Sequence, residues 1–148
     1  MDTETRIEGF IARFSDDAAA QIRAARAEMR RRLPGAVEMV YDNYNALAIG
    51  YGPTDKASEA VFSLACFPRR VSLVFTRGVD LDDPKGRLNG GGNQVRHIPL
   101  SDPAVLDDAE IVALWNQALA QAAAPFGRAT EGRTVIKSIS AKQRPRRS

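Results

Sequence analysis

The fold is decided by residues 36–51, AVEMVYDNYNALAIGY. In residues 37–42, Val, Met and Tyr alternate with Glu, Val and Asp, and this period of two is typical of a half-buried β-strand. Residues 42–45 read Asp-Asn-Tyr-Asn, which favours a turn, and residues 46–51 return as a second strand. The stretch therefore predicts an antiparallel β-hairpin.

Further strands are expected after the hairpin. Gly52-Pro53-Thr54-Asp55 ends the second strand, and two apolar runs follow at residues 61–67 and 71–76. Pro68-Arg69-Arg70 separates these runs as a turn would. A glycine-rich loop comes next, and residues 94–100 form the last strand of the predicted meander.

Three segments have helical periodicity. Apolar residues recur at helical spacing within residues 7–14, and a longer stripe extends from Ser15, a predicted N-cap, to Pro34-Gly35. Residues 107–110 resemble a capping box at the start of a final helix, which ends at Pro125. We therefore predict an α+β fold in which helices pack on one face of an antiparallel β-sheet, with residues 1–125 as its domain.

Positive charge is concentrated at the C-terminus of this 148-residue chain, whose net charge is +3. Residues 126–148 contain seven basic residues and one acidic residue, a local charge of +6. Residues 1–125 contain fourteen basic and seventeen acidic residues, a charge of −3. Within the basic extension, residues 134–139 are predicted to form an edge strand guarded by Lys137, and residues 141–148 a disordered tail.

The composition indicates a cytoplasmic protein. The single cysteine, Cys66, lies in an apolar run and is expected to be a buried, reduced thiol. Residues 1–9 lack the apolar segment of a secretory signal, and no stretch reaches the ~18 apolar residues of a membrane helix. We expect a monomer or homodimer that does not enter a membrane.

No pattern of residues predicts catalysis, a cofactor or a metal. His97 is the single histidine, which excludes a histidine-based zinc site. The glycine triplet at residues 90–92 matches no phosphate-binding motif, and a strand follows it where such motifs require a helix. Turn chemistry explains the acidic residues at positions 80–83, and no Gly-x-Ser-x-Gly sequence is present. The protein is therefore predicted not to be an enzyme.

Two groups of residues are candidates for binding. Aromatic, amide and guanidinium groups orient ligands in small-molecule pockets, and the hairpin and glycine-loop regions supply Tyr41, Tyr44, Asn45, Arg77, Arg96 and His97. Alternatively, the hairpin aromatics only cover the end of the sheet. The basic extension supplies Lys137, Lys142, Arg144, Arg146 and Arg147. These would bind a nucleic acid weakly and without sequence preference, or would only solubilise the chain.

Several stretches together resemble a known family. After the paired N-terminal helices come LPGAVE at residues 33–38, YDNYNAL at 41–47, GYGPT at 50–54, VSLVF at 71–75 and LNGGGNQVRHI at 88–98. Over residues 7–123 the chain resembles the YdhG-like domain family, a bacterial family (domain of unknown function 1801) whose function is unassigned. The resemblance implies a compact α+β sandwich.

The resemblance also raises the question of iron. One branch of the family has been proposed to deliver iron as frataxin does, which would require an acidic face. The second helix of this chain instead displays Arg23, Arg26, Arg30, Arg31 and Arg32, which disfavours that role. We therefore predict a non-enzymatic cytoplasmic domain that binds a small ligand or a protein partner, with non-specific nucleic-acid binding through the basic tail as the alternative.

Overall fold

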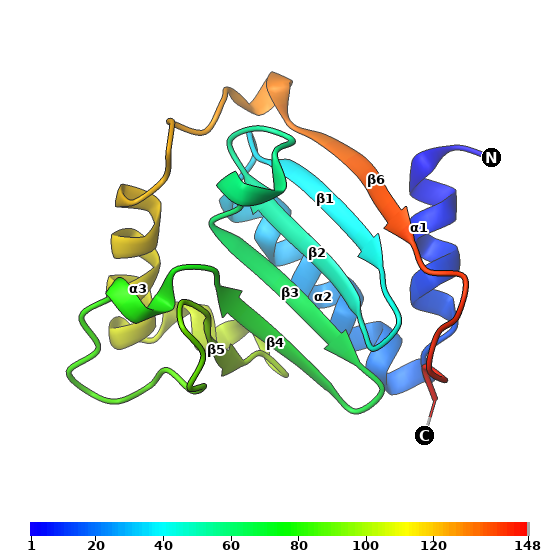
Figure 1. The fold of residues 1–148 in the computed structure, drawn as a ribbon, viewed down its shortest axis with the longest axis horizontal. Helices are drawn as coiled ribbons and strands as arrows, with labels where there is room; N and C mark the ends of the chain where they lie inside the picture. Colours follow the sequence, from blue (N-terminus) through cyan, green and yellow to red (C-terminus); the bar gives the residue numbers. More distant parts are fainter. Residues whose placement is uncertain (148) are drawn as a thin grey trace.

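The computed structural model describes residues 1–147, which form three α-helices and a six-stranded sheet (Figure 1). The helices are α1 (Thr3–Ala12), α2 (Asp16–Arg32) and α3 (Ala109–Ala120). The strands are β1 (Val37–Asp42), β2 (Leu47–Gly52), β3 (Phe62–Phe67), β4 (Arg70–Phe75), β5 (Arg96–Pro99) and β6 (Arg133–Ile139). Short 3-10 helices lie in the connections: η1 (Ala57–Glu59), η2 (Gly78–Asp80), η3 (Pro103–Asp107) and η4 (Ala129–Glu131). The predicted α+β fold class is confirmed.

The sheet has the strand order β5-β4-β3-β2-β1-β6. Strands β1 to β5 are joined by antiparallel pairings, as predicted. β6 differs, because it lies parallel to β1. Parallel pairing requires a long crossover connection, and the chain makes it by passing through α3 from the β5 edge to the opposite edge (Figure 1). The sheet is therefore mixed, with one parallel edge strand.

The helices lie over one face of the sheet. In the view of Figure 1, α2 runs behind the strands, with α1 and α3 on its two sides. The hydroxyl of Ser15 accepts a hydrogen bond from the amide of Ala18 at 3.2 Å, which confirms the predicted N-cap of α2. Trp115 of α3 stacks on Phe62 of β3 with a ring separation of 4.1 Å. No helix among residues 1–147 is long and apolar enough to span a bilayer.

The strand register places two acidic side chains on the covered face. Val40 pairs with Ile49, and both belong to the hydrophobic core. Because alternate strand residues share a face, Glu38 and Asp42 point the same way as Val40. Both are buried, with 2% and 1% of their surface exposed. A buried carboxylate is costly unless it is paired and hydrogen-bonded, so each requires a cation from another part of the chain.

The basic extension belongs to this fold. β6 contains the predicted edge strand, and it pairs with β1 along the whole of Val37–Asp42, so the extension adds a strand to the same sheet. Residues 141–147 do not form the predicted disordered tail, because they fold back over the β1–β2 hairpin. The amide of Arg144 donates to the carbonyl of Tyr44 at 2.8 Å, and Arg146 is only 3% exposed. The physical reason is Asp42, whose buried carboxylate pairs with Arg146.

Candidate functional site

The six predicted ligand-binding residues lie at opposite ends of the sheet. Tyr41, Tyr44 and Asn45 belong to the end where the β1–β2 and β3–β4 turns meet. Arg77 follows the far end of β4, and β5 carries Arg96 and His97 beside that end. Asn45 and Arg77 line separate cavities, of about 580 and 100 Å³. The structure therefore does not bring the six residues together in one pocket.

Arg96 and His97 hold the glycine loop in place. Nη1 of Arg96 donates to the carbonyl oxygens of Gly92 and Val95 at 2.7 and 2.8 Å. The backbone of His97 exchanges two hydrogen bonds with Asn89, at 2.8 and 2.9 Å. These contacts give both residues a local structural role.

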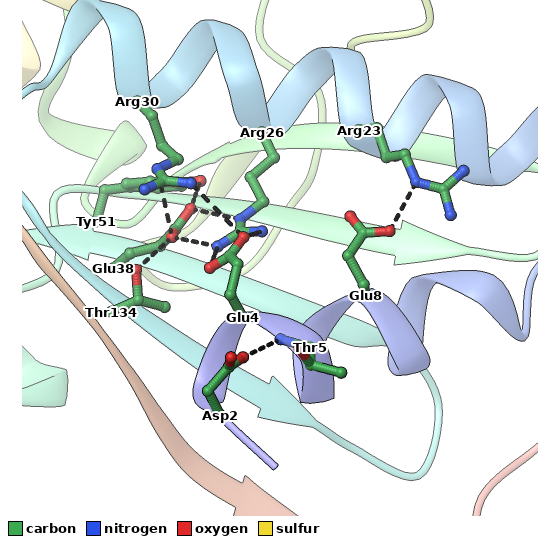
Figure 2. A network of polar contacts seen from close by, with 10 residues as sticks. All are labelled: Asp2, Glu4, Thr5, Glu8, Arg23, Arg26, Arg30, Glu38, Tyr51 and Thr134. Atoms are coloured by element: carbon green, nitrogen blue, oxygen red, sulfur yellow. Dashed lines mark hydrogen bonds and ion pairs between the residues drawn. The ribbon is translucent and has the colours of Figure 1, made fainter.

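A buried polar network lies on the covered face, at the end of β1 away from the hairpin (Figure 2). Glu38 accepts hydrogen bonds from Nε and Nη2 of Arg26 at 3.1 and 2.9 Å. It also accepts from the hydroxyls of Tyr51 at 2.6 Å and Thr134 at 2.9 Å. Arg26 binds Glu4 of α1 as well. The network thus joins two helices and strands β1, β2 and β6.

The electrostatics of this network favour the protonated forms of Tyr51 and Arg26. Burial, together with the adjacent charge of Glu38, raises the pKa of Tyr51 well above its usual value. Burial alone lowers the pKa of Arg26, but hydrogen bonds to Glu4 and Glu38 outweigh it and raise that pKa. A carboxylate has about four acceptor positions, and those of Glu38 are filled. The raised pKa values keep Tyr51 and Arg26 protonated at neutral pH, and their hydrogen bonds tie α1 and α2 to the sheet.

A cavity of about 450 Å³ beside the network is rimmed by Arg30, Arg31 and Arg133. Each of these three arginines already pairs with a carboxylate. The same holds for many arginines of the described chain: Arg13, Arg23, Arg26, Arg32, Arg77, Arg87, Arg128 and Arg146. The positive charge around this cavity is therefore largely neutralised by carboxylates of the protein itself.

At the hairpin end of the sheet, another pocket is lined by arginines without any acidic residue. This pocket, of about 580 Å³, lies between the β1–β2 turn, the β3–β4 turn and the C-terminal segment, residues 140–147. We call it the arginine pocket, and its lining residues are Asn45, Phe67, Pro68, Arg70, Arg144, Pro145 and Arg147. Asn45 comes from one predicted binding group, and two of the arginines come from the other. The lining contains three arginines and no acidic residue.

The three arginines of this pocket make contacts that leave their charge in place. The guanidinium of Arg70 lies 4.1 Å from the ring centre of Phe67, and that of Arg144 lies 5.7 Å from Tyr44. Nε of Arg147 donates to the carbonyl of Arg13 at 3.3 Å. Within residues 1–147, none of the three pairs with a carboxylate. All three are exposed, so a ligand can reach them from solvent.

The remaining cations predicted in the tail do not join this pocket. The side chain of Arg146 is buried and donates to the Asp42 carboxylate at 3.0 Å and to the carbonyl of Asn43 at 2.6 Å. Nζ of Lys137 donates to the carbonyl of Asp55 at 2.7 Å, and Asp55 also pairs with Arg133 at the start of β6, away from the hairpin. Lys142 is exposed outside the pocket lining. The five predicted cations therefore do not form one continuous contact surface.

Sequence reasoning did not single out Arg70, Phe67 or Pro68 as binding residues. Their signal is the basic turn Pro68-Arg69-Arg70, placed where two apolar strands end. Antiparallel neighbours bring this turn to the same end of the sheet as the β1–β2 turn. Knowledge of the sheet order was therefore needed to connect them with Asn45.

Searches against protein-family models, curated proteins and solved structures find no match. The resemblance to the YdhG-like family therefore stays a prediction. Among residues 1–147, no group of three or more His, Cys, Asp or Glu side chains is placed to hold a metal ion.

Proposed function

We propose that this protein is a non-enzymatic binding domain and that the arginine pocket binds a small ligand carrying phosphate or carboxylate groups. One observation carries the proposal: three arginines line one accessible pocket whose lining has no acidic residue. A guanidinium presents paired N–H donors that match the oxygens of phosphate and carboxylate, and its charge persists at any physiological pH. The cytoplasm, as predicted from the sequence, is the proposed location.

The form of the pocket favours a small ligand. Its volume of about 580 Å³ lies within the range of small-molecule sites, which is about 300–1,000 Å³. Phe67 and two prolines supply apolar surface, and Asn45 supplies an amide that can both donate and accept. Repulsion among three like charges in one pocket disfavours the empty state, and a polyvalent anion would relieve it.

Thermal denaturation with inorganic phosphate, pyrophosphate and citrate tests the proposal. An anion present at about 100 times its Kd adds about 2.7 kcal/mol to the free energy of unfolding. For a chain of this length, that corresponds to a rise in Tm of about 5–10 °C. We expect such a rise with at least one of the polyvalent anions, and calorimetry should give one site per chain.

Arg70→Ala is expected to weaken binding at least tenfold, because it removes one of the three charges. Arg128→Ala is the matched control, since Arg128 directly precedes η4, lies outside this pocket and pairs with Glu131. The proposal fails when none of the three anions raises Tm, or when Arg70→Ala binds as tightly as the wild type. Binding to duplex DNA that collapses between 50 and 200 mM salt, without any response to small anions, would replace it with the nucleic-acid hypothesis.

A further inference from the structure

The arginine pocket exists only while the C-terminal segment is docked. Arg144, Pro145 and Arg147 of this segment line it together with Asn45 and Arg70. Two of the three proposed anion-binding charges therefore come from residues 140–147. Whatever holds this segment against the hairpin also sets the geometry of the pocket.

A small set of contacts holds the segment. Arg146 donates to the Asp42 carboxylate at 3.0 Å, and Nε2 of Gln143 donates to the Asp42 carbonyl at 2.9 Å. The amide of Arg144 donates to the Tyr44 carbonyl at 2.8 Å. The buried pair of Asp42 and Arg146 is the strongest of these contacts, because both partners are charged and nearly free of water.

Two features of the C-terminal segment oppose its docking. Nε of Arg146 is buried and has no hydrogen-bond partner among residues 1–147, which leaves a desolvated donor unsatisfied. Docking also brings Arg144 and Arg147 into the pocket that already contains Arg70. The docked state therefore carries an unsatisfied polar group and a concentration of like charge, and only the second of these is relieved by an anion.

From these opposing terms we infer that anion binding and docking of residues 140–147 form one coupled equilibrium, with Asp42 and Arg146 as positioning residues for the arginine pocket. This inference rests on the proposed function. An anion that bridges Arg70 and the two arginines of the segment binds the docked state and favours it over the undocked one. Linkage is reciprocal, so docking raises anion affinity by the factor with which the anion favours docking.

Amide hydrogen exchange by NMR in the full chain measures this coupling at Arg144, whose amide is protected by its bond to Tyr44. Pyrophosphate at ten times its Kd is expected to slow exchange at Arg144 about tenfold, because opening then requires release of the anion. Amides of α2, at the core of the fold, serve as the internal reference. Global stabilisation alone would slow both sets to the same degree.

Two variants separate positioning from binding. Asp42→Asn is expected to speed basal exchange at Arg144 and to weaken pyrophosphate binding about tenfold, although Asp42 itself does not line the pocket. Arg70→Ala removes one of the like charges that oppose docking, so basal exchange at Arg144 should be no faster than in the wild type. Because this variant binds pyrophosphate at least tenfold more weakly, the same pyrophosphate concentration should slow its exchange only about twofold or less. Arg146→Lys, which retains the charge but loses the planar fork, provides the same test in a chain whose Asp42 is intact.

The outcomes distinguish this inference from the proposed function. Pyrophosphate that binds the wild type by calorimetry without slowing exchange at Arg144 would overturn the coupling and leave the binding proposal standing. Full pyrophosphate affinity in both Asp42→Asn and Arg146→Lys would likewise overturn it. Absence of any binding to the wild type would instead contradict the proposed function, and the coupling would fall with it.

Discussion

Replacing Tyr51 by Phe tests whether the Glu38 network stabilises the fold. The Tyr51 hydroxyl donates to Glu38 at 2.6 Å, and the tyrosine is 1% exposed. Phe keeps the ring in the core and removes this single donor. A hydrogen bond to a charged group contributes about 1.5–3 kcal/mol. We therefore expect urea denaturation at pH 7 to show a loss of about that size in the free energy of unfolding.

The pH dependence of the same variant gives a second measurement. Burial and the charge of Glu38 raise the pKa of Tyr51 well above 10. Above pH 10 the unfolded chain loses the tyrosine proton while the folded chain keeps it, so stability falls as pH rises. At pH 11 this costs the wild type about 1.4 kcal/mol, and the Phe variant does not lose it. The difference in stability between the two proteins should shrink by that amount.

Tyr44→Phe is the matched control, because Tyr44 is 49% exposed and lies on the hairpin turn. Its stability should stay within about 0.5 kcal/mol of the wild type. A Tyr51→Phe protein as stable as the wild type at pH 7 would refute the stabilising role of the hydroxyl. A stability difference that stays constant from pH 7 to 11 would show that Tyr51 ionises in the folded protein.

Three further predictions concern two glycines and the thiol. A Cβ on Gly35 would lie 1.7 Å from the carbonyl oxygen of Gly127, so Gly35→Ala should destabilise by about 1–3 kcal/mol in urea. Gly9→Ala, in an open position within α1, should stabilise by about 1 kcal/mol, and a loss there would contradict the helical placement. Burial raises the pKa of Cys66 to about 12, so the folded thiol stays protonated while the unfolded thiol ionises above about pH 8.5. Stability should therefore fall between pH 8.5 and 9.5, a slope that Cys66→Ala lacks, and rapid labelling of native Cys66 by a thiol reagent would contradict its burial.

Local patterns in the sequence were sufficient to predict the helices and strands themselves. The hairpin at residues 36–51 and the N-cap at Ser15 depend on neighbours within a few positions, and both are confirmed. Alternation along β1 could not say which side faces the core. An outward position for Glu38 is the default for a charged residue. The structure places it inward because Arg26 and Thr134, 12 and 96 positions away, supply its partners.

The arginine pocket could not be predicted from the sequence because it also depends on contacts between residues far apart in the chain. A count of charges treats each basic residue of the tail as solvated, whereas Arg146 finds its carboxylate 104 positions earlier. Once that pair forms, Arg144 and Arg147 are brought to the β1–β2 hairpin, and Arg70 joins them from the β3–β4 turn. The site therefore depends on long-range pairing that no local period encodes.

A buried carboxylate paired with a distant arginine occurs at both ends of strand β1. The two pairs differ in how completely their hydrogen-bonding groups are satisfied. Glu38 and Asp42 share the covered face, and each buried carboxylate is matched by an arginine from a distant segment. At Glu38 every acceptor position is filled, and the arginine also binds a second carboxylate. At Asp42 the arginine keeps a buried Nε without a partner in the described chain. Polar networks rigidify a fold when they are fully satisfied, so the Glu38 end should remain fixed while the Asp42 end, which carries the arginine pocket, is the one that can respond to a ligand.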